Sequence, residues 1–190
     1  MVNLKKSTQP VEKNDTTPPG PPRIDPIEQE TNKQAIQITG TSEAGVTVTL
    51  SLNNKTDEAV SGSDGTFSFK VNLIKGENII FATAKDSSGN ESQKAPLISI
   101  IYDNEPPTLE ISRPSDGAVF FGSRERQITL QARTESGANV TINERIIAVD
   151  QDGKFTFTTT LSEGDNSFNV KATDKAGNLT EKTISVKFSL

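Results

Sequence analysis

The chain has 190 residues, of which 32% are hydrophobic and 24% are charged, and it carries a formal net charge of −5 at pH 7. It contains no cysteine and no histidine, which excludes disulfides, thiol nucleophiles, Ser-His-Asp triads and the zinc sites built from these residues. An acidic chain without a Lys/Arg stripe is not expected to bind nucleic acid, and no apolar run is long enough for membrane insertion within this segment.

The length fits one or two domains, and the low apolar content favours two thin cores over one thick core. Thr, Ser, Asn and Asp are abundant, and the apolar residues are largely Val, Ile and Phe. This bias favours strands and turns, and no stretch has convincing helical periodicity. We therefore predict an all-β chain.

Residues 1–16 are polar, and we expect them to form a disordered, flexible leader. They lack a signal-peptide core, so we expect any export signal or membrane anchor to lie outside this segment. The next stretch, Thr17-Pro-Pro-Gly-Pro-Pro22, cannot continue a strand ladder and marks the start of a first domain, residues 17–103.

Within this domain, Phe67, Phe69, Val71 and Leu73 alternate with polar residues, so we expect a strand that is buried on one face. The Asp64-Gly65 pair before it predicts a hairpin turn that needs a positive φ. The predicted strands of this domain include Ala35–Thr41, Val46–Leu52, Thr66–Leu73, Asn78–Lys85 and Pro96–Tyr102.

Asp103-Asn-Glu-Pro-Pro107 is a short linker that two prolines stiffen, and we predict a second domain over residues 104–190. Its predicted strands include Thr108–Ser112, Gln127–Arg133, Asn139–Asn143, Lys154–Leu161, Ser167–Thr173 and Thr183–Phe188.

The second domain repeats the first. Asp152, Phe155 and Phe157 lie 88 residues after Asp64, Phe67 and Phe69, whereas "SEAGVTV" at Ser42 matches "TESGANV" at Thr134 with an offset of 92. A tandem duplication explains both offsets. Each copy has about seven short predicted strands separated by frequent turn signals, which is typical of an immunoglobulin-like sandwich. We predict two tandem immunoglobulin-like β-sandwiches.

The stretches "TPPGPPRID", "ITGTSEAGVTVTL", "SDGTFSFKVNLIKGENII", "ATAKDSSGNES" and "KATDKAGNLTE" resemble the bacterial immunoglobulin-like domains of repetitive cell-surface and adhesin proteins. They are also similar to the sandwich modules appended to secreted glycosidases such as glucodextranase. The resemblance covers residues 17–190. It implies a stalk, an adhesin repeat or an enzyme accessory.

Both copies contain a D-x-x-G-N loop, at Asp86–Asn90 and at Asp174–Asn178. One interpretation is a plain turn, in which the aspartate caps backbone N–H groups and the glycine takes a positive φ. The other is an interdomain calcium site at the second loop, because Ca²⁺ prefers six to eight oxygen ligands and several acids converge there. The candidate ligands are Asp103, Glu105, Glu135, Asp174 and Asn178.

A second candidate site is the aromatic pair Phe120 and Phe121, in a stretch where the second copy departs from the first. Neighbouring strand residues point to opposite faces, so one ring is expected to be exposed and to contact a ligand, unless both pack at a sandwich edge.

No residue pattern indicates a catalytic cleft, and we expect a non-enzymatic protein. The favoured function is a spacer or adhesion module of an exported bacterial surface protein, extracellular and monomeric, that holds a binding or catalytic unit away from the cell. A protein or a polysaccharide at a cell surface is the expected partner. The alternative is a carbohydrate-binding accessory module of a secreted glycoside hydrolase.

Overall fold

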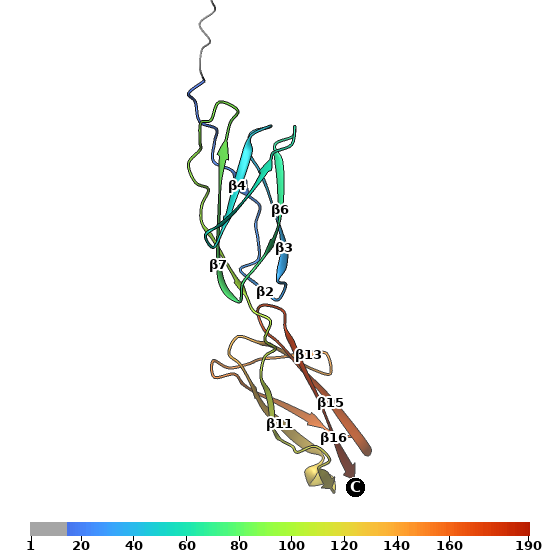
Figure 1. The fold of residues 1–190 in the computed structure, drawn as a ribbon. Coiled ribbons are helices and arrows are strands. Elements are labelled where there is room, and N and C mark those ends of the chain that lie inside the picture. Colours follow the sequence, from blue (N-terminus) through green and yellow to red (C-terminus); the bar gives the residue numbers. More distant parts are fainter. Residues whose placement is uncertain (1–14) are drawn as a thin grey trace, which may run out of the picture. The chain divides into compact units, whose positions relative to one another are not determined.

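The structure is a computed structural model that describes residues 15–190 (Figure 1). The predicted flexible leader, residues 1–16, lies outside the described residues apart from its last two positions. The described chain consists of β-strands and one short 3-10 helix, so the predicted all-β class is confirmed. No helix among these residues has the length and apolar character needed to cross a membrane. The chain divides into two compact units, each described by itself: residues 15–27, 36–71 and 79–99 form the first, and residues 28–35, 72–78 and 100–190 the second. The strands at residues 30–31 and 98–102 nevertheless pair in a sheet of the first sandwich, and they are described with it.

The first sandwich packs a three-stranded sheet of order β1-β3-β6 against a five-stranded sheet of order β2-β8-β7-β4-β5. The strands are β1 (Arg23–Ile24), β2 (Glu30–Thr31), β3 (Ala35–Thr41), β4 (Thr47–Leu52), β5 (Lys55–Val60), β6 (Thr66–Asn72), β7 (Gly76–Lys85) and β8 (Ile98–Tyr102).

The second sandwich has the same plan, with sheets of order β14-β11-β9 and β10-β16-β15-β12-β13. Its elements are β9 (Leu109–Arg113), β10 (Val119–Phe121), η1 (Ser123–Glu125), β11 (Gln127–Thr134), β12 (Asn139–Ile142), β13 (Arg145–Ile147), β14 (Lys154–Thr160), β15 (Gly164–Thr173) and β16 (Leu179–Ser189). The short strand β10 runs parallel to β16, whereas the neighbouring strands in the rest of these two sheets are antiparallel.

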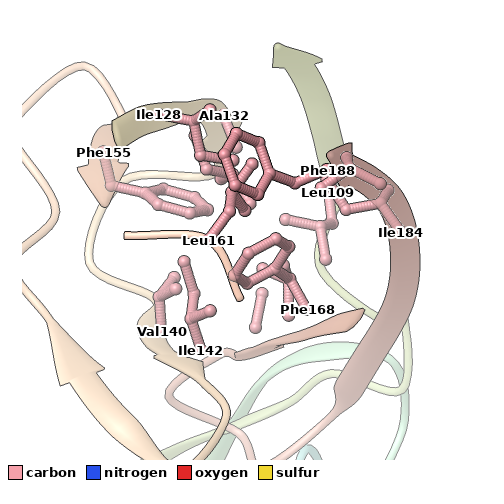
Figure 2. Close-up of a cluster of buried hydrophobic side chains, with 14 residues drawn as sticks. Leu109, Ile128, Ala132, Val140, Ile142, Phe155, Leu161, Phe168, Ile184 and Phe188 are labelled. Carbon is pink, nitrogen blue, oxygen red and sulfur yellow. The ribbon is translucent and has the colours of Figure 1, made fainter. Parts of the chain in front are cut away.

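Each sandwich has its own apolar core, built from the inward-facing residues of its strands. In the second, Phe155 comes from one sheet and Phe168 and Phe188 from the other, and their rings point into the same space between the sheets (Figure 2). In the first, Phe67 and Phe69 are buried and their rings meet edge to face, with centroids 5.8 Å apart. Two separate cores confirm the prediction of two sandwiches.

The predicted inward face of β14 needs one correction. Phe155 is buried as expected, but Phe157 is only partly buried and packs at the side of the core. Its ring meets Phe168 edge to face with centroids 6.4 Å apart. The matching residue of the first sandwich, Phe69, is 3% exposed. The two copies therefore fill the same position to different degrees.

The Asp-Gly turns have the backbone that their sequence predicts. Gly65 and Gly153 have φ values of 79° and 80°. A side chain at Gly153 would also collide with the chain, because a Cβ atom there would lie 1.9 Å from the carbonyl oxygen of Thr134. Glycine is thus required at this turn by both conformation and space.

Candidate functional sites

The first D-x-x-G-N loop connects β7 to β8 and closes on itself through its aspartate. Asp86 Oδ1 accepts hydrogen bonds from the backbone N–H groups of Ser88, at 2.9 Å, and Asn90, at 2.8 Å. The other carboxylate oxygen accepts one from Asn90 Nδ2 at 2.8 Å. Gly89 has a φ of 89°, as the turn interpretation requires. The hydrogen bond from Asn90 is the main cause that lowers the pKa of Asp86, because these donors stabilise the charged carboxylate.

The second loop connects β15 to β16 and has nearly the same geometry. Asp174 Oδ1 accepts from the backbone N–H of Asn178, and Asp174 Oδ2 accepts from Asn178 Nδ2, both at 2.8 Å. Gly177 has a φ of 91°. Both loops have the geometry that a turn requires: each is held together by its own aspartate and asparagine.

The asparagine of each loop also reaches the segment that leads into its own sandwich. Asn90 Nδ2 donates to the carbonyl oxygen of Asp15 at 3.1 Å, and Asn178 Nδ2 donates to that of Asp103 at 2.9 Å. In both sandwiches the two residues are 75 positions apart. Each loop therefore fixes the start of its sandwich to the end of its penultimate strand.

The lead-in segments share a motif that the sequence analysis missed. Asp15 and Asp103 each begin a D-x-x-P-P stretch, and the two stretches are 88 residues apart, the same offset that relates most of the two copies. The side chains of both aspartates cap the backbone N–H two residues on, Thr17 and Glu105, at 3.0 Å. The signal in the sequence is the repeated Pro-Pro pair, at Pro18-Pro19 and Pro106-Pro107, with an aspartate three residues before each pair.

Four of the five candidate calcium ligands lie in one neighbourhood of the second sandwich. The pKa of Glu135 is raised, first by partial loss of solvation and then by the negative charges of Asp174 and Asp103. Asn178 joins this group through its hydrogen bonds. Glu105 contributes its backbone N–H, while its side chain is exposed.

In residues 15–190, no three His, Cys, Asp or Glu side chains are gathered closely enough to hold a metal ion. Both carboxylate oxygens of Asp174 already accept hydrogen bonds from Asn178. A calcium ion there would need some of these side chains to turn towards it. Calcium binding stays a prediction.

The aromatic pair lies on the edge strand β10. Phe120 is partly buried and packs against the second core, whereas Phe121 is 64% exposed. Phe121 is held in place by its backbone N–H, which donates to Glu125 Oε2 at 2.9 Å. The two rings thus point to opposite faces, as neighbouring strand residues do. A ligand for the exposed ring stays a prediction.

Comparison with known proteins gives the same architecture. Two successive stretches, residues 25–102 and 107–190, match the sequence model of the family described as glucodextranase, domain B. Bacillopeptidase F of Bacillus subtilis (strain 168) is 32% identical over 155 residues, which are 80% of this chain but 10% of that protein. The chain thus spans about a tenth of the length of this relative.

Among solved structures, the fibronectin(III)-like modules of Clostridium thermocellum CbhA match with a TM-score of 0.57 and 17% identity. The match covers 88% of this chain and 94% of that one, which supports the sandwich fold. A Ca²⁺-stabilized ice-binding adhesin of an Antarctic bacterium matches with a TM-score of 0.45 and 18% identity, over 93% of this chain and 50% of that one. The predicted resemblance to glucodextranase sandwich modules is confirmed, and the chain belongs to the glucodextranase domain B family.

Proposed function

We propose that this chain is a non-catalytic tandem of sandwich modules that serves as a spacer or adhesion segment of an exported bacterial surface protein. It holds a binding or catalytic unit at a distance from the cell. It acts outside the cell as a monomer, and its partner is a protein or a polysaccharide at a cell surface.

The observation that carries this proposal is the path of the chain through each sandwich. In the second, the chain begins beside the loop of Asn178, to which Asp103 is hydrogen-bonded. The last strand, β16, starts at that same loop and runs away from it for 11 residues. At about 3.3 Å per residue, this strand spans roughly 36 Å, so the chain leaves the sandwich at the end opposite to its start. Modules with this path lengthen a chain each time they are repeated.

Two comparisons support the proposal. The family is named for one domain of a glucodextranase, and the match to bacillopeptidase F covers 10% of that protein. In both cases a sandwich of this kind is one part of a larger chain. A part that two such different proteins share is more plausibly a carrier than the seat of either activity.

The spacer proposal is tested by small-angle scattering of the whole chain, with sedimentation to establish its mass. We expect a monomer whose maximum dimension is that of two modules connected in series. Replacing Pro106 and Pro107 by glycine should broaden the distribution of dimensions, because the prolines restrict the linker. A maximum dimension no greater than that of one sandwich would contradict a spacer.

The exposed ring of Phe121 favours a second candidate function, a carbohydrate-binding accessory of a secreted glycoside hydrolase. A panel of neutral polysaccharides separates the two functions. Retention that disappears with Phe121→Ala favours the accessory, and Leu97→Ala is a control, because Leu97 is an equally exposed apolar residue of the other sandwich. Lack of retention on the whole panel leaves the spacer.

We further propose that Ca²⁺ binds beside the second D-x-x-G-N loop and relieves the repulsion among Asp103, Glu135 and Asp174. The pKa of Glu135 is raised first by partial loss of solvation and then by the charges of Asp174 and Asp103, and this second cause supports the proposal. Millimolar Ca²⁺ should raise the melting temperature of the second sandwich as RT ln(1 + [Ca²⁺]/Kd) requires. Glu135→Gln should weaken the effect, and Mg²⁺ at the same concentration serves as the control. An unchanged melting temperature with Ca²⁺ would leave both loops as plain turns.

A further inference from the structure

A groove lies at one edge of the second sandwich, beside strand β10. It encloses about 440 Å³, which is within the usual range for small-ligand sites. Phe120 and Ile128 supply apolar surface, and Ser115, Gln127 and Thr129 supply hydroxyl and amide groups. Two arginines, Arg113 and Arg124, also line it.

The two arginines are free to bind a ligand. Neither guanidinium group has an ion pair or a hydrogen bond within the described residues. The acids nearest in sequence are occupied: Glu125 accepts from the backbone N–H of Phe121 at 2.9 Å, and Asp116 from that of Ser185 at 2.8 Å. Glu125 also lines the groove and keeps its negative charge, so two arginines and one glutamate leave a net positive charge there, in a chain whose net charge is −5.

The first sandwich has different chemistry at the same place. The counterpart of Arg113-Pro114 is Asp25-Pro26, 88 residues earlier, and the Asp25 carboxylate accepts a hydrogen bond from Thr39 Oγ1 at 2.5 Å. After this proline, residues 26–34 contain no arginine and no aromatic residue. The matching segment, residues 114–126, is four residues longer and carries Phe120 and Arg124. The features that line the groove thus belong to the second copy alone.

We propose that this groove binds an acidic polysaccharide, one whose sugar units carry carboxylate groups. Arg113 and Arg124 bind the carboxylates, because the planar guanidinium matches them in a two-point hydrogen bond. The ring of Phe120 offers an apolar surface to the flat face of a sugar. The Gln127 amide and the Thr129 hydroxyl form hydrogen bonds with the sugar hydroxyls.

A polysaccharide fits this groove better than an acidic peptide does. The groove combines charge with an aromatic surface and several uncharged polar groups, which suits a ligand that has a hydroxyl on most of its carbons. Nucleic acid is disfavoured, because its closely spaced phosphates call for a stripe of Lys and Arg residues, and the sequence has none. The inference goes beyond both candidate functions, because it uses neither Phe121 nor a neutral polysaccharide, so its test can fail or succeed independently of theirs.

The test is affinity electrophoresis of the whole chain through native gels that contain polygalacturonate, neutral dextran or poly-L-glutamate. We expect polygalacturonate to retard the protein. The double variant Arg113→Gln/Arg124→Gln should bind at least about tenfold more weakly, because two charge-assisted hydrogen-bonding groups are lost. Phe121→Ala should bind normally, since Phe121 does not line the groove.

The matched control is Lys70→Gln/Arg145→Gln, which removes the same charge from exposed strand positions outside the groove. It should bind within about twofold of the unmodified chain, since distant surface charges are largely screened by salt. Equal melting temperatures establish that both double variants fold. The proposal is wrong if polygalacturonate does not retard the protein, or if the control variant loses as much affinity as the groove variant. Dextran or poly-L-glutamate binding as strongly as polygalacturonate would also overturn it.

Discussion

At the second D-x-x-G-N loop, one side-chain amide joins two parts of the chain that are 75 residues apart. Asn178 is 9% exposed, and its Nδ2 donates both to Asp174 Oδ2 and to the carbonyl oxygen of Asp103. Alanine at this position would leave the Asp103 carbonyl oxygen and Asp174 Oδ2 without this donor, at a site that is only partly accessible to water. We expect Asn178→Ala to lower the free energy of unfolding by about 1–3 kcal/mol in urea titrations.

Asn104→Ala is the control for this prediction, because Asn104 is an exposed neighbour in the same lead-in segment. It should change the stability by less than about 0.5 kcal/mol. If the two variants were equally stable, the Asn178 side-chain amide would contribute nothing to the link between its loop and Asp103.

The pKa of Glu135 predicts how stability changes with pH. Its pKa is raised above the ordinary value of 4.5 in the folded state, so the folded protein binds this proton more tightly than the unfolded chain does. The stability that this carboxyl group contributes is therefore present below pH 4.5 and is lost as the pH rises through the raised pKa. We expect Glu135→Gln to be more stable than the unmodified chain at pH 7, by less than about 1 kcal/mol because the group is exposed and screened.

Thermal unfolding at pH 7 and at pH 4 measures this effect, with Glu163→Gln as an exposed control. The gain should shrink or vanish at pH 4, where Glu135 is protonated in both states. A gain that is the same at both pH values would mean that the charge of Glu135 is not the cause.

The residue types of the two loops could be predicted from the sequence, but their partners could not. Asp, Gly and Asn at this spacing favour a turn because each suits a particular backbone need. The partner of Asn178, however, is a backbone carbonyl, and any residue at position 103 would present one. Arg113 and Arg124 were missed for a related reason: they are 11 positions apart, at the end of β9 and in η1, and they line one groove only in the folded sandwich.

At the scale of strands, the sequence predicted every interior strand of the four sheets and three edge strands, β6, β9 and β14. Five strands were not predicted, and every one is an edge strand: β1, β2, β5, β10 and β13. Alternation reveals a strand only when one face is buried, and the burial pattern of β5 is almost uniformly exposed. Each of these strands forms because the adjacent strand of the sheet offers unpaired backbone N–H and C=O groups. The sequence of the edge strand itself therefore does not reveal it.

Strands β6 and β14 also give a prediction about the two cores. The sequence treats Phe69 and Phe157 as equivalent, but Phe69 is 3% exposed whereas Phe157 is only partly buried. We expect Phe69→Ala to cost about 3–5 kcal/mol of unfolding free energy, and Phe157→Ala about half of that, because less apolar surface returns to water.

Separate unfolding transitions for the two sandwiches allow each loss to be assigned in the whole chain. Phe155→Ala provides the comparison within the second sandwich, because Phe155 is buried there. A larger loss for Phe157→Ala than for Phe155→Ala would contradict the observed orientation of β14.

At the scale of the whole molecule, each sandwich has its own core, so each should fold when it is expressed alone. The predicted division at residues 103 and 104 would separate Asp103 from the sandwich to which Asn178 ties it. We expect fragment 102–190 to unfold at a higher urea concentration than fragment 104–190, by about 1 kcal/mol in free energy, which is the value of one buried hydrogen bond.

Both fragments should give cooperative unfolding curves and dispersed amide signals. Adding Asn178→Ala to each is the internal control, since it should remove the difference between the two lengths. Two fragments of equal stability would place the start of the module after Asp103.

The hydrogen bond from each loop asparagine to the carbonyl oxygen of an aspartate 75 residues earlier also defines the unit that a gene duplication would have to copy. Both partners of this hydrogen bond belong to the same sandwich. A segment that begins at the aspartate therefore contains both of them. Such a segment can be inserted or deleted in frame without a matching change in the segment before it. The number of modules in a chain of this kind can then change by recombination between copies, without new mutations where the modules join.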